Sequence, residues 1–379
     1  MKLVFVTDNG FSEKNGVYYY SAPNYTHVRH LKPYFSDFVF VARKDKYDSS
    51  SFKIGSNRDS DVHLFNKRNV FEMIKLLKEQ IRGADFVICY GITGYFACQI
   101  GKKYGVPTIA YNGGDVYEFL KSRGTLRGQI LAPIMRHLEE KKFGIADYAH
   151  YCDGFLVDRY PTQGKVLVAS GVSIDIEEIN LEKRIKKIRS PNTGRPVIGL
   201  IGHTKNNLKG IGTAIRAVAK MGGDVELQIV GRGEHAQYDV LAESLKVKDS
   251  IKFLGTLKAG DEIFNWLDNI DVYIQPSLVE GLPRATIEAM SRGCPVVASN
   301  AGGLPRLIDS EFRIEFGDYV SLAEKLTGLL SDEYLMEEQA IENFEKAKEF
   351  SSDIRIKKYD EFYSDVIKSL ERKNRNLLY

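Results

Sequence analysis

The chain is poor in cysteine. Its 379 residues include only Cys89, Cys98, Cys152 and Cys294, and no two of them have the C-x-x-C spacing of a redox or zinc motif. Four scattered cysteines also exclude a disulfide framework. This usage is typical of a reducing compartment, so we expect a cytoplasmic protein.

Long apolar runs are also missing. No run approaches the roughly 20 residues needed to span a bilayer, so we expect any membrane contact to be peripheral. Residues 1–8 hold only four apolar side chains after a single lysine. That run is too short for the core of a signal peptide, and we expect it to form a buried first strand.

The sequence has no large excess of charge. Its 53 Lys and Arg against 50 Asp and Glu give a formal net charge of +3, which is too balanced for bulk nucleic-acid binding, so we expect no nucleic-acid partner. The composition, 43% hydrophobic and 27% charged, is that of an ordinary globular protein. The length allows two domains, each with its own core.

Short apolar segments alternate with helical ones in both halves of the chain. In the first half we predict strands at residues 3–6, 38–41, 62–65, 86–90, 108–111 and 154–157, with a helix over 70–81. In the second half we predict strands at residues 197–201, 225–230, 251–254, 272–275 and 296–299, with helices over 211–221 and 285–291. This pattern predicts an α/β fold with two doubly wound parallel sheets.

The predicted domains are an N-terminal domain of residues 1–178 and a C-terminal domain of residues 196–350. Between them, residues 179–195 are basic and then rich in turn residues, as in a solvated linker. Contact of this basic run with phospholipid is the alternative. Residues 351–379 are helical and charged.

The most informative stretch is residues 276–290, where a predicted strand leads through a turn into a helix. Backbone N–H groups at such a helix start attract phosphate. Glu280 lies in the loop and Glu288 about two turns into the helix, so the two carboxylates cannot touch one group. Carboxylates accept hydrogen bonds from sugar hydroxyls, so one could hold a hexose and the other a ribose. The alternative is that both are solvated.

Residues 276–305, which include Gly293-Cys294-Pro295 and Gly302-Gly303-Leu304-Pro305, resemble the donor-site signature of the family-4 retaining glycosyltransferases of the GT-B fold. The resemblance implies two Rossmann-like domains facing across a cleft. The C-terminal domain would hold a nucleotide diphosphate sugar and the N-terminal domain the acceptor, without a metal. The last helix would cross back onto the N-terminal domain.

The resemblance also implies roles for single residues. Glu288 would grip the ribose and Glu280 the transferred sugar. The amides of Gly281 and Leu282 would hold sugar and diphosphate, with Pro283 in the same donor-binding turn. Arg306 departs from the pattern, because an acidic residue commonly follows Gly-Gly-x-Pro.

Cations are needed where the diphosphate departs, since it carries about two negative charges. In the family the loop after the first strand of the second domain reads Gly-Arg and then Lys-Gly; Lys209-Gly210 matches the second element. His203 replaces the arginine, and histidine is only a conditional cation. Either Lys205 supplies the missing charge or His203 hydrogen-bonds the phosphate. A solvated lysine-rich loop is the alternative.

Two further donor-side candidates come from glycine-containing turns. Arg232, in Gly231-Arg232-Gly233, lies where the family places nucleotide contacts, and Gly16 lies where the family has a glycine-rich loop near the donor phosphate. A plain turn is the alternative at both places.

Asn112 and Asp115 follow the strand predicted at residues 108–111. Family members commonly show His-Gly-x-Asp here, with the histidine near the transferred sugar and the aspartate on the acceptor side. Asn112 replaces the histidine and cannot act as a base at neutral pH. In the front-face route proposed for the family, the departing phosphate oxygen takes the acceptor proton instead. Asn-Gly is also a common turn pair.

Residues 121–137 mix basic and apolar side chains at helical spacing. They could lie on an anionic inner membrane near a lipid-linked acceptor, or form a core-facing helix with a solvated basic face.

The resemblance therefore implies a retaining hexosyltransferase that moves a sugar to a glycan or lipid-linked saccharide in surface polysaccharide or glycoconjugate synthesis. Its predicted catalytic residues are Glu280, Lys209, His203 and Asn112. The departures at His203 and Asn112 leave a non-catalytic nucleotide-sugar-binding subunit as an alternative. A hydrolase, epimerase or phosphorylase on the same scaffold is another.

Overall fold

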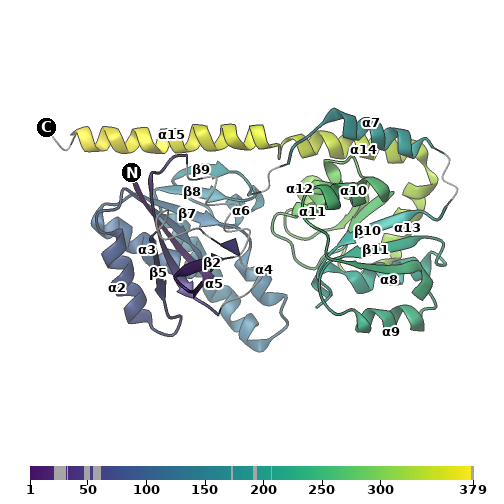
Figure 1. Cartoon of the computed structure of the whole chain (residues 1–379), viewed down its shortest axis with the longest axis horizontal. Coiled ribbons are helices and arrows are strands. Elements are labelled where there is room, and N and C mark those ends of the chain that lie inside the picture. Colours follow the sequence, from purple (N-terminus) through teal and green to yellow (C-terminus); the bar gives the residue numbers. More distant parts are fainter. Residues whose placement is uncertain are drawn as a thin grey trace. The chain divides into compact units, whose positions relative to one another are not determined.

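The computed structural model describes residues 1–20, 31, 33–46, 52–53, 61–171, 174–190, 194–205 and 207–376. The chain divides into two compact units (Figure 1). Unit 1 comprises residues 1–171 and 356–379, and unit 2 comprises residues 172–355. Each unit has a parallel sheet and a hydrophobic core of its own.

The parallel sheet of unit 1 has the order β5-β3-β1-β6-β7-β8-β9. Its strands are β1 (Lys2–Lys14), β3 (Asp37–Lys44), β5 (Asp61–Phe65), β6 (Phe86–Tyr90), β7 (Thr108–Asn112), β8 (Tyr148–Tyr151) and β9 (Lys165–Val168). The direction of winding reverses between β1 and β6, which is the Rossmann arrangement. Most strand residues are buried, because helices cover both faces of such a sheet.

Strand β1 continues beyond the sheet into a hairpin with β2 (Val17–Tyr20), which in turn pairs with β4 (Phe52–Lys53). The turn is Asn15-Gly16, and both residues have positive φ, +54° and +70°. This is the backbone that a two-residue hairpin turn requires, and Asn-Gly is its preferred sequence. Gly16 therefore lies at the tip of a β-hairpin, in the plain turn that was the alternative to a donor-side loop.

In the described part of unit 1, the helices with defined bounds are α2 (Val70–Ile81), α3 (Gly91–Tyr104), α4 (Val116–Lys121), α5 (Leu126–Ile145), α6 (Phe155–Arg159) and most of α15 (Ser352–Asn376). The strand predicted at residues 154–157 is wrong, because this segment belongs to α6. Its start is fixed by Asp153, whose carboxylate accepts a hydrogen bond from the backbone N–H of Phe155 at 3.0 Å. The true strand, β8, contains the buried polar residue His150 and was missed for that reason.

The sheet of unit 2 has the order β12-β11-β10-β13-β14-β15, again a Rossmann arrangement. Its strands are β10 (Val197–Ile201), β11 (Glu226–Val230), β12 (Ile251–Gly255), β13 (Val272–Gln275), β14 (Val296–Ser299) and β15 (Arg313–Ile314). Its helices are α7 (Glu178–Ile188), α8 (Ile211–Lys220), α9 (Ala236–Ser244), α10 (Asp261–Asn269), α11 (Arg284–Met290), α12 (Leu304–Leu307), α13 (Tyr319–Ser331) and α14 (Glu333–Lys348). The winding reverses between β10 and β13.

The segment predicted as a solvated linker, residues 179–195, is largely helix α7 of unit 2; residues 191–193 lie outside the described part. Arg184 is buried, and its guanidinium donates to the carbonyls of Ile270 at 2.6 Å and Leu267 at 2.7 Å. Arg189 pairs with Glu337 at 2.5 Å. Arg184 and Arg189 therefore hold α7 to its neighbours.

Helix α15 returns the chain to unit 1. Its residues Tyr359, Phe362 and Tyr363 are buried in the core of that unit, and Tyr363 makes an edge contact with Phe35 at 6.0 Å between ring centroids. Among the described residues, no helix has both the length and the apolar character needed to cross a bilayer.

Candidate active site

Two loops meet where the winding of the unit 2 sheet reverses. One follows β10 and ends at Lys209, and the other follows β13 and contains Glu280. The Nζ atom of Lys209 lies 2.6 Å from Oε1 of Glu280. Ligands of open α/β sheets bind at the carboxyl ends of the strands beside such a reversal. The pair predicted from two distant motifs is thus brought together at the place where this fold binds ligands.

A chain of buried polar side chains fixes the Glu280 carboxylate. Oε1 of Glu280 accepts a hydrogen bond from Ser277 Oγ at 2.7 Å, and Ser277 Oγ accepts one from Gln275 Nε2 at 2.8 Å. Tyr273 OH donates to Gln275 Oε1 at 2.5 Å. Burial, and then the charge of Glu280, raise the pKa of Tyr273 well above its usual value, so the phenol stays a donor. A satisfied network of this kind holds a carboxylate in one position.

The sequence patterns did not single out Tyr273, Gln275 and Ser277. They occupy alternate positions along and just after β13, so their side chains share one face of the sheet. Polar residues at this spacing in an otherwise apolar strand, directly before Glu280, were the available signal.

Two glycines let the loops approach closely. Gly302 has φ +53°, and a Cβ atom there would lie 2.0 Å from the carbonyl oxygen of Glu280. Gly210 has φ +71°, and its Cβ would lie 1.9 Å from the carbonyl oxygen of Pro276. Both positions require glycine, for space and for backbone conformation. This gives a physical reason for the glycines in the Lys-Gly and Gly-Gly elements of the sequence motifs.

Glu288 is separate from this network. It lies on α11, and its Oε1 accepts a hydrogen bond from Arg284 Nε at 2.8 Å. Its side chain is mostly buried. Helix α11 has only seven residues and starts directly after Pro283. A helix this short supplies little dipole, so the helix start is a weaker phosphate site than the sequence suggested.

The remaining turn residues, Gly281 and Leu282, lie between Glu280 and this helix. The carbonyl of Gly281 accepts a hydrogen bond from the backbone N–H of Gly303 at 3.1 Å.

The loops after β10 and β11 lie side by side, since the backbone N–H of Thr204 donates to the carbonyl of Arg232 at 3.2 Å. His203, Lys205 and Arg232 are exposed on these loops. Partial burial, and then the positive charges of Arg232 and Lys209, lower the pKa of His203 below its usual value. The lowered pKa favours the neutral imidazole of His203, which can hydrogen-bond, while Lys205, Lys209 and Arg232 are the basic side chains of these loops.

In unit 1, Asn112 ends β7 and is buried. Its Nδ2 donates to Glu139 Oε2 at 3.3 Å, and its Oδ1 accepts from the backbone N–H of Gly114 at 2.7 Å. Glu139 is itself paired with the fully buried Lys142 at 2.8 Å. Burial raises the pKa of Glu139, and the lysine opposes that rise. The Asn112 amide is therefore bonded at both ends.

Asp115 caps the start of α4. Its carboxylate accepts hydrogen bonds from the backbone N–H of Tyr117 at 2.9 Å and from Tyr160 OH at 2.8 Å, and it pairs with Arg159 at 2.9 Å. Only 4% of its side chain is exposed. These contacts give Asp115 a role in holding the loop that follows Asn112.

Comparisons with known proteins relate this chain to a family. Residues 182–347, which include the loops after β10 and β13, match the model of the glycosyl transferases group 1. Protein CapJ of Staphylococcus aureus is 29% identical over 311 residues, which cover 80% of this chain and 77% of CapJ. Residues 182–347 are therefore similar to the glycosyl transferases group 1, and the chain is a glycosyltransferase.

Two further comparisons extend this result. The amylovoran biosynthesis glycosyltransferase AmsK of Erwinia amylovora is 36% identical over 138 residues, 33% of this chain and 34% of AmsK. The crystal structure of Anabaena Alr3699/HepE in complex with UDP superposes with a TM-score of 0.71 at 16% identity, covering 96% of this chain and 100% of that one. The glycosyltransferase described here therefore has the GT-B fold.

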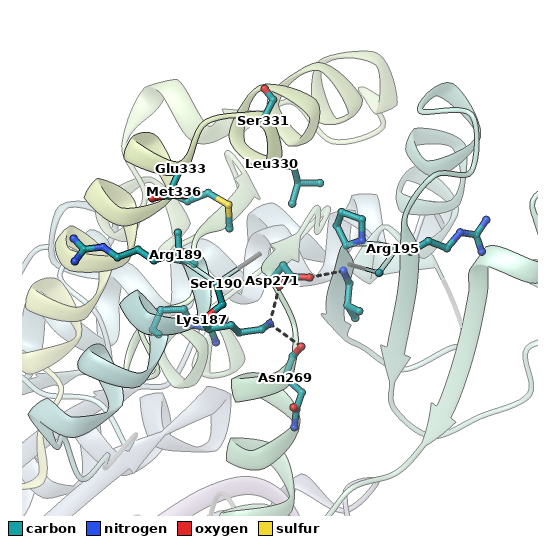
Figure 2. A pocket seen from close by; sticks show the side chains of 15 residues that line it. Lys187, Arg189, Ser190, Arg195, Asn269, Asp271, Leu330, Ser331, Glu333 and Met336 are labelled. Atoms are coloured by element: carbon teal, nitrogen blue, oxygen red, sulfur yellow. Dashed lines mark hydrogen bonds and ion pairs between the residues drawn. The ribbon is translucent and has the colours of Figure 1, made fainter. Parts of the chain in front are cut away.

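A cavity of about 750 Å³ lies in unit 2 at the amino ends of β10 and β13, the ends opposite to the Lys209–Glu280 pair (Figure 2). Lys187 Nζ lies 2.7 Å from Asp271 Oδ1 and donates to the carbonyl of Asn269 at 2.8 Å. Asp271 Oδ2 accepts from the backbone N–H of Val197 at 2.7 Å. Lys187 and Asp271 thus neutralise each other and fasten α7 to the residues next to β10 and β13. Ligands of α/β sheets bind at the carboxyl ends of the strands, and this cavity lies at the amino ends.

Among the described residues, no group of three or more His, Cys, Asp or Glu side chains is placed to hold a metal ion. The predicted site residues themselves fall into two sets. Unit 2 contains Glu280, Glu288, Lys209, His203, Lys205, Arg232, Gly281, Leu282 and Pro283, and unit 1 contains Asn112, Asp115 and Gly16.

Proposed function

We propose that this glycosyltransferase is a family-4 retaining enzyme that takes its sugar from a nucleotide diphosphate sugar. The observation that carries the proposal is the contact of Lys209 with Glu280 at 2.6 Å, at the reversal point of the unit 2 sheet. A cation beside a carboxylate suits a ligand that presents phosphate next to sugar hydroxyls. A nucleotide diphosphate sugar has that sequence of groups.

The residues of unit 2 divide the donor between them. Lys209, with Lys205 and Arg232 on the neighbouring loops, would balance the charge that develops on the departing diphosphate. Neutral His203 would donate a hydrogen bond to a phosphate oxygen. Glu280 would accept hydrogen bonds from the transferred sugar. Glu288 would hold the ribose, and the amides of Gly281 and Leu282 would contact sugar and diphosphate beside Pro283.

Retention of configuration would follow a front-face route. Asn112 cannot take a proton at neutral pH, and its amide is bonded to Glu139 and Gly114. The oxygen of the departing phosphate would therefore take the proton of the acceptor hydroxyl. Because side-chain cations meet the leaving group, we propose that the reaction needs no metal.

The names of similar proteins support the donor and pathway classes. Alr3699/HepE was crystallised in complex with UDP. AmsK is named for amylovoran biosynthesis. We propose that this enzyme adds a sugar to a glycan or lipid-linked saccharide in surface polysaccharide synthesis, working in the cytoplasm at the inner face of the membrane.

A donor screen tests this proposal. The purified protein would be incubated with a panel of nucleotide diphosphate sugars and a glycolipid extract, and release of nucleotide diphosphate would be followed. We expect turnover with one donor, and a product that keeps the anomeric configuration of that donor. Binding without turnover would favour a non-catalytic subunit, and an inverted product would exclude the retaining route. No binding to any donor would contradict the proposal.

A further inference from the structure

Helix α5 of unit 1 is apolar on two sides. One side packs into the unit through Ala132 and Phe143, which are fully buried. On the other side Leu126, Ile130 and Ile134 are 74%, 57% and 51% exposed. Their spacing of four residues places them in one line, roughly opposite the buried side. Core packing therefore explains the first side, and no described residue of unit 1 covers the second side.

Helix α4 extends this exposed surface. Its Phe119 is 46% exposed, and the guanidinium of Arg123 lies over the Phe119 ring at 4.7 Å. The end of α4 meets the first turn of α5 closely, since a Cβ on Gly128 would lie 2.4 Å from the carbonyl oxygen of Leu120. We call Phe119, Leu126, Ile130 and Ile134 the apolar stripe.

The charge around the apolar stripe is positive. Lys121, Arg123 and Arg127 are exposed at the start of α5 and just before it. Every carboxylate of residues 115–142 is paired with a cation, in the pairs Asp115–Arg159, Glu118–Arg159, Glu139–Lys142 and Glu140–Arg136. The acidic side chains of the segment therefore do not neutralise the three cations.

We propose that the apolar stripe and these cations dock unit 1 on an anionic lipid bilayer. Aliphatic and aromatic side chains on an exposed helix face, with Lys and Arg beside them, are the composition of helices that lie in the membrane interface. Each cation near such a surface contributes attraction to anionic headgroups. A protein partner that used this face would need an acidic rim. If the face binds such a protein instead of lipid, the wild-type enzyme will not bind anionic vesicles.

Docking on a membrane would explain why this surface lies close in the chain to Asn112 and Asp115. This explanation rests on the proposed function. Helix α4 is capped by Asp115, three residues after Asn112 at the end of β7. A lipid-linked acceptor would then be presented to the strand end where the acceptor side of the site was predicted. Soluble saccharides would not need the surface.

Vesicle co-sedimentation tests the apolar part. Wild-type enzyme should bind vesicles of phosphatidylcholine with 30% phosphatidylglycerol. Changing Leu126, Ile130 and Ile134 to Ser should weaken this binding at least about tenfold, because burying each exposed apolar side chain favours the bound state. The matched control is Val70→Ser with Phe71→Ser on α2, where the side chains are 55% and 90% exposed. This control should bind like wild type.

A charge-reversal pair tests the basic part. Arg123→Glu with Arg127→Glu should abolish the preference for anionic vesicles, whereas Lys102→Glu with Lys103→Glu at the end of α3 should keep most of it. Added salt should weaken wild-type binding, since exposed charges are screened within about 10 Å at 0.1 M.

Activity separates this proposal from the proposed function. The triple Ser variant should keep wild-type turnover of donor with a water-soluble saccharide acceptor and lose turnover of a lipid-linked acceptor in vesicles. Wild-type enzyme that binds vesicles but transfers no sugar would contradict the proposed function alone. Absence of wild-type binding to anionic vesicles would overturn the docking proposal. So would a triple variant that binds vesicles like wild type, or that changes only the oligomeric state.

Discussion

The two glutamates of the central motif differ in surroundings. Glu280 is buried, and its carboxylate contacts Ser277 and Lys209 just beyond the carboxyl end of β13. Glu288 is held by Arg284 on α11. The sequence separated the two by their spacing, but it could not show that Lys209, 71 residues earlier in the chain, is the partner of Glu280.

This difference predicts a division of labour. Glu288→Ala should weaken the binding of free nucleotide diphosphate and of intact donor to the same extent, because it removes a ribose contact. Glu280→Ala should weaken only the binding of the donor, since free nucleotide carries no transferred sugar. Isothermal titration of both variants with both ligands measures the split. Equal effects of the two substitutions on both ligands would contradict the assignment.

His203 predicts a dependence of stability on pH. Its pKa is lowered in the folded protein, so the unfolded chain binds more protons between the folded pKa and the usual value of about 6.5. Stability should therefore fall as pH drops through this window. His203→Asn removes this contribution, and thermal unfolding at pH 7.5 and 5.5 should show a smaller loss for the variant than for wild type. Identical losses would show that His203 has no lowered pKa.

At the scale of elements, the sequence patterns predicted bounds correctly where an apolar or periodic run was unbroken, and they failed where the structure buries polar residues. Strands β10, β13 and β14 and helix α2 begin and end as predicted, because each is a continuous apolar or periodic run. Strand β8 was missed, since buried His150 interrupts its apolar pattern. Helix α7 was taken for a linker, because the burial of Arg184 depends on the carbonyls of Leu267 and Ile270 at the end of α10, which no local pattern reveals.

Substitution by alanine should have opposite effects on stability at Gly302 and Gly328 of unit 2. Gly302→Ala should destabilise the protein and displace Glu280, since Gly302 has φ +53° and no room for a Cβ. Gly328→Ala on α13 should leave activity unchanged and stabilise the fold by about 0.5–1 kcal/mol, because alanine is the better helix former and Gly328 has open space. Chemical denaturation with activity assays measures both. A stable, active Gly302→Ala variant would refute the packing account.

At the scale of the whole molecule, the chain uses the Rossmann arrangement twice, and α15 returns to the first unit. The alternation of strands and helices was enough to predict this architecture. It was not enough to predict the β1–β2 hairpin, where the Asn15-Gly16 turn joins β1 to β2. The exposed side of α5 was predicted only as one of two alternatives, because spacing alone does not show which side is buried.

The claim that most depends on this architecture is that Lys209 receives the diphosphate at the reversal point of the unit 2 sheet. The direct measurement is kcat/KM for release of nucleotide diphosphate by wild type, Lys209→Met and the control Lys220→Met, which changes an exposed lysine at the end of α8. Loss of a group that stabilises developing charge costs about 100- to 1000-fold, so Lys209→Met should fall by that factor and Lys220→Met should match wild type. Equal kcat/KM for all three proteins would contradict the account.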